Sequence, residues 1–104
     1  MAAFRIHRNK SSSSEQYPYI VDVQSELLSD LETRLSIPLT ASTEIVGKPI
    51  RNLNPTVVIG KDVYVVLTQQ MAAIPRAVLG EELKDVAIDR SQILSSIDFL
   101  ITGI

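Results

Sequence analysis

The 104-residue sequence contains no cysteine and no tryptophan, and His7 is its single histidine. Without cysteine, the chain has no disulfide bond, zinc–thiolate site, iron–sulfur cluster or thiol nucleophile. One imidazole excludes a metal site built from several histidines within one chain. Aromatic residues make up 5% of the sequence, so a platform that stacks nucleic-acid bases is poorly supported.

The sequence also lacks a large excess of charge of either sign: 10 basic and 12 acidic residues give a net charge of −2. Proteins that bind nucleic-acid phosphates are usually basic, so we expect no direct, sequence-specific DNA binding by this chain alone. No stretch approaches the roughly 20 apolar residues that span a bilayer. Residues 1–10 lack the apolar core of a signal peptide. We therefore expect a cytoplasmic protein that does not enter a membrane.

What the sequence does contain is a globular composition, with 45% hydrophobic and 21% charged residues. The length fits one domain over residues 1–104, with enough buried surface for one core. Alternating and β-branched residues predict strands over most of the chain. The predicted strands are residues 3–7, 17–24, 33–39, 55–59, 63–68 and 74–79.

The connections between these strands carry further signals. Residues 9–16 contain four serines and no apolar residue, which predicts an exposed flexible loop. Pro38 cannot donate to a strand ladder and therefore suggests an edge strand or a bulge. Gly60-Lys61-Asp62 predicts a tight hairpin.

The chain ends in a predicted amphipathic helix. Asp89 and Gln92 are spaced as an N-cap and its N3 partner, and Gly103 lies where a helix favours a left-handed cap residue. The predicted apolar stripe consists of Ile93, Leu94, Ile97, Leu100, Ile101 and Ile104. Strands followed by one helix indicate a mainly β, α+β or barrel-like domain, and not a βαβ fold.

We predict no catalytic residue, no cofactor and no metal site. His7 lies on the polar face of its predicted strand without a visible partner, so we expect a surface or rim residue. The acids Glu81, Glu82, Asp85 and Asp89 fit the positive end of a helix dipole better than a carboxylate site. The serine loop is a poor place to preorganise a nucleophile, and no phosphate-binding or nucleophile-elbow motif occurs.

Two apolar features remain unassigned. Leu27 and Leu28 stand in an otherwise polar connection, where they act either as a plug under the sheet or as an exposed anchor. Ile101 and Ile104 lie at the helix end, where chain termini tend to be exposed, so they are candidates for contact with a partner.

The order of the chain's motifs resembles the CcdB toxin family of toxin–antitoxin modules over its whole length. The motifs are VDVQS at 21–25, RLSIPL at 34–39, Asn54-Pro55 with Ile59-Gly60, Leu67-Thr68 with MAAIP at 71–75, LGEE at 79–82 and IDFLITGI at 97–104. The resemblance implies an SH3-like barrel-type antiparallel β-core with a C-terminal helix, related to the MazF and Kid toxins.

The resemblance also implies a function and partners. The expected protein is a homodimer that binds the A subunit of DNA gyrase and traps the covalent gyrase–DNA cleavage complex, as in plasmid maintenance. It is a poison and not an enzyme. A CcdA-type antitoxin is expected to neutralise it through a disordered C-terminal segment that folds on binding.

Site residues follow from the resemblance by position. The expected gyrase-binding residues are Leu27, Leu28, Asp98, Ile101, Thr102, Gly103 and Ile104. The expected antitoxin-binding residues are Arg8, Asn9, Lys10, Ser11, Glu44, Ile45, Val46 and Gly47.

The chain departs from the best-known member of that family at two of these positions. That member has tryptophan at the position of Thr102 and asparagine at that of Asp98. Tryptophan is a typical anchor of interfaces and threonine is not, so gyrase binding is expected to be weaker or to rest on the leucines and isoleucines. The alternative function is a MazF-like endoribonuclease that cleaves mRNA on the same type of core, against which stand the acidic pI and the few aromatic residues.

Overall fold

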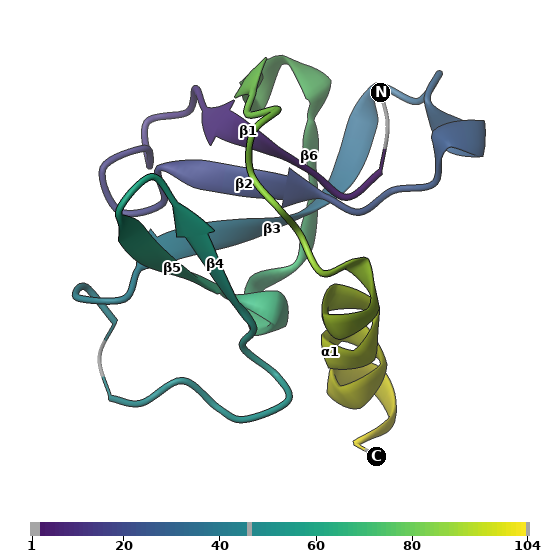
Figure 1. Ribbon diagram of the computed structural model, residues 1–104. Coiled ribbons are helices and arrows are strands. Elements are labelled where there is room, and N and C mark those ends of the chain that lie inside the picture. The colour runs from purple at the N-terminus through teal and green to yellow at the C-terminus, as the bar shows by residue number, and fades with distance from the viewer. Residues whose placement is uncertain (1–2, 46, 104) are drawn as a thin grey trace.

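The computed structural model describes residues 3–45 and 47–103, and within these ranges the chain forms seven strands and one α-helix (Figure 1). The strands are β1 (Arg5–Asn9), β2 (Tyr19–Asp22), β3 (Thr33–Ala41), β4 (Thr56–Ile59), β5 (Asp62–Val66), β6 (Ala72–Pro75) and β7 (Leu79–Glu82). Short 3₁₀ segments are η1 (Glu26–Leu28), η2 (Thr68–Gln70) and η3 (Arg76–Val78), and the helix is α1 (Arg90–Thr102). The expected mainly β class with a C-terminal helix is confirmed.

The strands pair antiparallel in the order β4-β5-β3-β2-β1-β7, and β6 pairs separately with β3. The long strand β3 therefore has two partners on one side: β6 along Thr33–Ser36 and β5 along Leu39–Ala41. Pro38 lies between these two stretches, opposite Ile20 of β2. Of the two alternatives, the edge strand was wrong, because a central strand tolerates proline where no neighbour needs its missing N–H.

Two other strand predictions had different outcomes. The tight hairpin is confirmed: Ile59 pairs with Asp62, and Gly60 has φ +65° in the turn between them. The single strand predicted over residues 74–79 was wrong. Pro75 ends β6, η3 reverses the chain, and β7 then pairs with β1 on the far side of the sheet.

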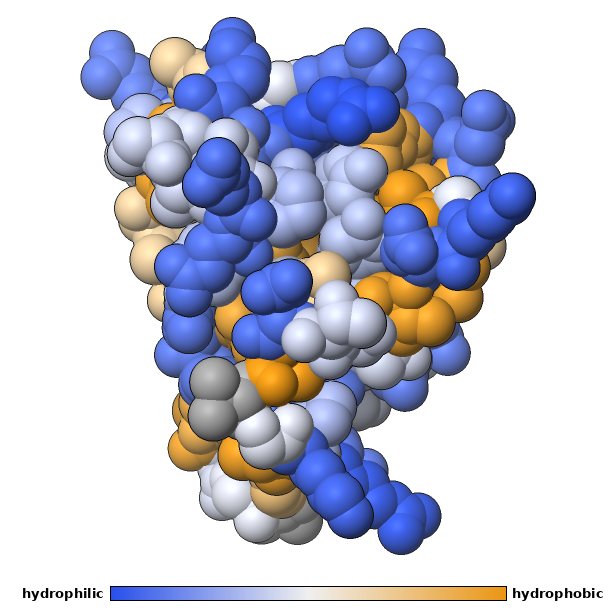
Figure 2. Space-filling model, turned by 90° about the vertical axis from the view of Figure 1, so that its left-hand side faces the viewer, coloured by the Kyte–Doolittle hydropathy of each residue, from blue (hydrophilic) through white to orange (hydrophobic). Residues whose placement is uncertain are grey.

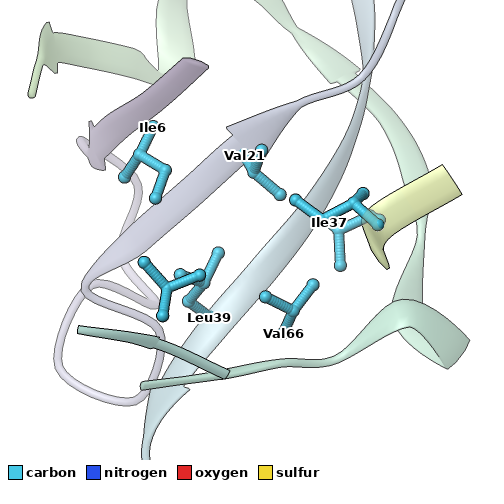
Figure 3. Close-up of a cluster of buried hydrophobic side chains, with 7 residues drawn as sticks. Ile6, Val21, Ile37, Leu39 and Val66 are labelled. Atoms are coloured by element: carbon cyan, nitrogen blue, oxygen red, sulfur yellow. The ribbon is translucent and has the colours of Figure 1, made fainter. Parts of the chain in front are cut away.

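One hydrophobic cluster holds the sheet and the helix together. Its fully or almost fully buried members are Ile6, Val21, Ile37, Leu39, Val57, Val66 and Ile93. Figure 3 shows the labelled side chains from β1, β2, β3 and β5 pointing toward one another. Fully burying a side chain of this kind stabilises the fold by about 1.5–3 kcal/mol, so the cluster fixes how the strands stack.

The helix begins and ends as its sequence predicts. The Asp89 side chain accepts a hydrogen bond from the Gln92 N–H at 3.1 Å. Gly103 has φ +73° and its N–H donates to the Phe99 carbonyl at 2.8 Å. No helix within the described ranges is long and apolar enough to cross a membrane.

The helix docks through a narrower face than predicted. Ile93 and Ser96 are its buried residues, and the Ser96 hydroxyl lies 3.1 Å from the buried Thr68 hydroxyl of η2. The predicted stripe was therefore wrong in part, because Leu94, Leu100 and Ile101 are exposed. Figure 1 shows why: α1 projects away from the strands toward its C-terminal end. Ile104 lies outside the described residues.

Candidate functional site

His7 is buried and lies on no accessible surface. Its side chain is 5% exposed, and its Nδ1 lies 3.0 Å from the Gly80 carbonyl of β7. The expectation of a surface residue was wrong, because β7 pairs alongside β1 and its Gly80 carbonyl contacts the imidazole. A general base must reach the proton that it abstracts, so this buried histidine offers a ribonuclease no accessible acid–base group.

Leu27 and Leu28 are exposed on η1. Leu27 is 94% exposed and Leu28 is 50% exposed, although both are large and apolar. The Ser25 side chain caps this short turn by accepting a hydrogen bond from the Leu27 N–H at 3.2 Å. The alternative in which the two leucines plug the underside of the sheet was therefore wrong. Their exposure is what a partner-binding anchor requires. We call this pair the leucine surface.

The side chain of Gln24 fastens the leucine surface to the sheet. Its Nε2 donates to the Leu28 carbonyl at 2.9 Å, and its Oε1 accepts from the Leu35 N–H at 2.9 Å. Gln24 is itself buried, with 9% of its surface exposed. One carboxamide thus joins the end of η1 to β3 and holds the two leucines in a defined position.

A buried ion pair lies behind this glutamine. Arg34 Nη2 lies 2.8 Å from Asp22 Oδ2, its Nε donates to the same oxygen at 2.9 Å, and both side chains are fully buried. Arg34 Nη2 also donates to the Gln24 carbonyl at 3.3 Å, and Asp22 Oδ1 accepts from the Gln24 N–H at 3.0 Å. The ion pair therefore fixes the backbone from which η1 departs.

The C-terminal end of α1 presents a second candidate surface, which we call the helix end. It consists of Asp98, Ile101, Thr102 and Gly103, all exposed. Ile101 is 73% exposed, and the Thr102 hydroxyl donates back to the Asp98 carbonyl at 2.8 Å. The helix end is thus an apolar side chain beside a carboxylate, followed by the left-handed turn at Gly103.

A hollow lies between η1 and the first turns of α1. It is lined by Ala3, Phe4, Val23, Ser25, Glu26, Arg90 and Leu94. The Arg90 guanidinium stacks 4.8 Å above the Phe4 ring and ties the helix to the strand side of this hollow. Leu94 is 47% exposed and precedes Ile101 by seven residues, about 10 Å along the same helix face. Leu94 and Ile101 therefore share one face of α1, and Leu94 borders the same hollow as Glu26 of η1.

The expected antitoxin-binding residues fall on two segments. Arg8 and Lys10 are exposed and Ser11 is half-buried, whereas Asn9 is buried. The Asn9 carboxamide donates to the Tyr17 carbonyl at 2.7 Å and accepts from the Ser11 N–H at 2.8 Å. The serine loop is exposed as predicted, but these hydrogen bonds give it a defined shape.

The second segment belongs to the connection between β3 and β4. Glu44 and Gly47 are exposed, Ile45 is half-buried, and Val46 lies outside the described residues. Gly47 has φ +84°, which favours glycine at this turn. Figure 2 shows the side of the molecule that carries this connection and the serine loop; hydrophilic side chains cover most of it, with separate hydrophobic patches.

Sequence reasoning missed Leu94 and the polar network under η1. Leu94 was assigned to the core because its spacing matches the helical period. The network did leave a signal, since Asp22 and Arg34 are opposite charges inside apolar strands that pair with one another. Such charges are rarely buried unless they are paired.

The sequence model of a family described as CcdB protein matches residues 3–103, nearly the whole chain. The chain therefore belongs to the CcdB family, whose members are toxins of toxin–antitoxin modules that act on DNA gyrase.

Proposed function

We propose that this protein binds the A subunit of DNA gyrase and traps the covalent gyrase–DNA cleavage complex. The observation that carries the proposal is the exposure of Leu27 and Leu28 on a turn that buried hydrogen bonds hold in place. Ile101 at the helix end supplies a second apolar contact. The toxin works by binding, and the cleavage chemistry belongs to gyrase.

The energetics of such a contact favour the leucines as its anchors. Burying an exposed leucine or isoleucine gains about 1.5–3 kcal/mol. Interface energy concentrates in a few central residues, and rigid presentation lowers the ordering cost of binding. Because Thr102 stands where the best-known member of the family has tryptophan, Leu27, Leu28 and Ile101 carry the affinity.

The toxin acts as a homodimer in this proposal. A twofold axis near the helix ends presents two copies of the leucine surface and of the helix end. The gyrase A subunit is itself a twofold dimer, so matched symmetry doubles the contacts without any new residue type.

The antitoxin partner is of the CcdA type. Its disordered C-terminal segment folds against residues 8–11 and 44–47. Binding of this kind spends part of its interaction energy on ordering the segment, and in return covers a large surface.

A cleavage assay with purified gyrase tests the proposal. Relaxed plasmid, gyrase and ATP are incubated with the protein, and the products are treated with detergent and protease. We expect linear DNA to accumulate as protein is added, and addition of the antitoxin to abolish it. Linear DNA that stays at the level of gyrase alone, across toxin concentrations up to tens of micromolar, overturns the proposal.

The same preparation tests the ribonuclease alternative. Messenger RNA incubated with the toxin alone, without gyrase, is expected to remain intact. Cleavage at defined sites that the antitoxin suppresses would favour the ribonuclease and contradict the proposal.

A further inference from the structure

The turn that carries the leucine surface is not held in place by hydrophobic burial. None of the three residues of η1 is buried, and segments with few buried apolar contacts open easily. The positions of Leu27 and Leu28 therefore depend on hydrogen bonds. The Gln24 side chain supplies one of them, at the Leu28 carbonyl.

Backbone hydrogen bonds join η1 to the residues that follow it. The Leu28 N–H donates to the Ser25 carbonyl at 3.0 Å, and the Leu31 N–H donates to the Leu28 carbonyl at 3.2 Å. Residues 25–31 thus form two consecutive turns that meet at Leu28, and we call them the leucine segment. A displacement at Leu31 is transmitted directly to Leu28.

Arg76 holds the far end of the leucine segment. Its Nη2 donates to the Leu31 carbonyl at 2.7 Å, across 45 residues of sequence. Its backbone N–H donates to the Glu32 carbonyl at 2.9 Å. A hydrogen bond from a charged donor is roughly twice as strong as one between neutral groups. Arg76 therefore fixes the end of the leucine segment, as Gln24 fixes its middle.

The backbone of Arg76 is itself firmly placed. Arg76 begins η3 directly after Pro75, which pairs with Thr33 where β6 ends. The Leu79 N–H closes η3 by donating to the Arg76 carbonyl. The side chain thus reaches the leucine segment from the chain reversal between β6 and β7, which is anchored in the sheet on both sides.

The placement of the Arg76 side chain also has a cost in stability. Its Nε is buried and has no hydrogen-bond partner within the described part of the chain. A buried donor without a partner loses its hydration and gains nothing in return. This cost offsets part of the stability that the bond to the Leu31 carbonyl provides, so removing the guanidinium changes the overall stability little.

We infer that Arg76 is a positioning residue for gyrase binding, which acts by holding the leucine segment in the form that binds. This inference rests on the proposed function, because it takes the leucine surface as the contact with gyrase. A surface that is ordered before it binds loses less conformational entropy on binding. Release of the Leu31 carbonyl therefore weakens binding although both leucines remain in the sequence.

Arg76→Met tests the inference in the gyrase cleavage assay, because methionine keeps an apolar stem and lacks the guanidinium. We expect the toxin concentration for half-maximal cleavage to rise about tenfold and the melting temperature to stay within about 2 °C of wild type. Arg76→Lys keeps a cationic donor and is expected to restore the half-maximal concentration to within about threefold of wild type.

The matched control is Arg51→Met. Arg51 is an exposed arginine of the connection between β3 and β4, so this variant makes the same change of side chain and of charge away from the leucine segment. Its half-maximal concentration is expected to stay within about twofold of wild type.

Amide hydrogen exchange of the free toxin provides a readout that a general loss of stability would not reproduce. We expect Arg76→Met to speed exchange of the Leu28 and Leu31 N–H groups at least about fivefold. Exchange at Val21, which is fully buried in β2, is expected to stay at the wild-type rate.

The outcomes separate this inference from the proposed function. If the wild type traps gyrase and Arg76→Met does so at the same concentration, the positioning role is wrong and the gyrase proposal stands. A rise that Arg51→Met shares, or that leaves Leu28 and Leu31 exchange unchanged, or that comes with faster exchange at Val21, also overturns the positioning role. If the wild type traps no cleavage complex, both are overturned.

Discussion

At the scale of single residues, the Asp22–Arg34 ion pair places two opposite charges inside the protein, because both side chains are fully buried. Removing one partner leaves the other charge buried without compensation. We expect Asp22→Ala to lower the free energy of unfolding by about 3–5 kcal/mol, measured by urea denaturation. The exposed Asp30→Ala is the control and is expected to stay within about 0.5 kcal/mol of wild type. A loss below 1 kcal/mol for Asp22→Ala would contradict this role of the pair.

The leucine surface gives a second prediction at the same scale. Leu28 is 50% exposed and Leu31 is 49% exposed, so lysine at either position keeps its charge in water. We expect Leu28→Lys to abolish gyrase poisoning and to leave the melting temperature within about 2 °C of wild type, since exposed substitutions cost little stability. Leu31→Lys is the matched control and keeps both properties. A large melting drop for Leu28→Lys would mean that this leucine supports the core.

Some of these residues could be predicted from the sequence and others could not. Alternation along a strand separates its two faces, but it does not say whether a face is covered. His7 was therefore placed on the correct face and given the wrong exposure, because β7 returns from 73 residues away to cover it. Leu27 and Leu28 left two alternatives open for the same reason: exposure depends on which segments pack nearby.

At the scale of elements, predictions that depend on neighbouring residues were correct, and predictions that depend on segments distant in the sequence were not. Asp89 and Gly103 mark the ends of α1 correctly because capping involves hydrogen bonds within a few residues. The buried face of α1 is determined by its contact with η2. There the Thr68 hydroxyl lies within hydrogen-bond distance of the Ser96 hydroxyl, so a serine and not a leucine of α1 is buried at this contact. The division between β6 and β7 likewise depends on two different pairing partners, β3 and β1.

The two ends of α1 are expected to differ in function. Thr102 and Gly103 are exposed beyond the docked turns, so deleting residues 102–104 is expected to leave the core intact. We expect the truncated protein to fold, to bind antitoxin, and to lose gyrase poisoning in a cell-killing assay. Gly103→Val should act similarly, because φ near +73° strains a β-branched residue and changes the direction of the chain beyond it. A truncated protein that still kills cells, or that no longer folds, would contradict the role of the helix end.

The control for this prediction lies at the other end of the same helix. Asp89→Ala removes the N-cap hydrogen bond to the Gln92 N–H and should cost about 1 kcal/mol of stability. Gyrase poisoning by this variant is expected to stay at the wild-type level, because the helix end is unchanged. The two changes to α1 thus separate stability from gyrase poisoning. Thermal melting measures the first and the killing assay measures the second.

At the scale of the whole molecule, the single chain has a larger solvent-accessible surface area than is typical of a monomer of its mass. A monomer of 11.5 kDa typically exposes about 5,800 Å², whereas this chain exposes 6537 Å². The excess of about 700 Å² is close to what each partner of a standard interface buries. The outer turns of α1 project beyond the sheet (Figure 1), and Leu94, Leu100 and Ile101 of this helix are exposed.

This excess surface leads to the last prediction, a dimer in dilute solution. Sedimentation velocity at micromolar concentration is expected to show a species of twice the 11.5 kDa chain mass. Replacing both Leu94 and Leu100 by glutamate places charges on the uncovered helix face and should shift the protein to the monomer while β-sheet circular dichroism persists. Ser95→Glu, on the same helix and already exposed and polar, is the control and should remain dimeric. A wild-type protein that sediments as a stable monomer would mean that the projecting helix is reserved for gyrase, and that the twofold match to the gyrase A dimer plays no part in poisoning.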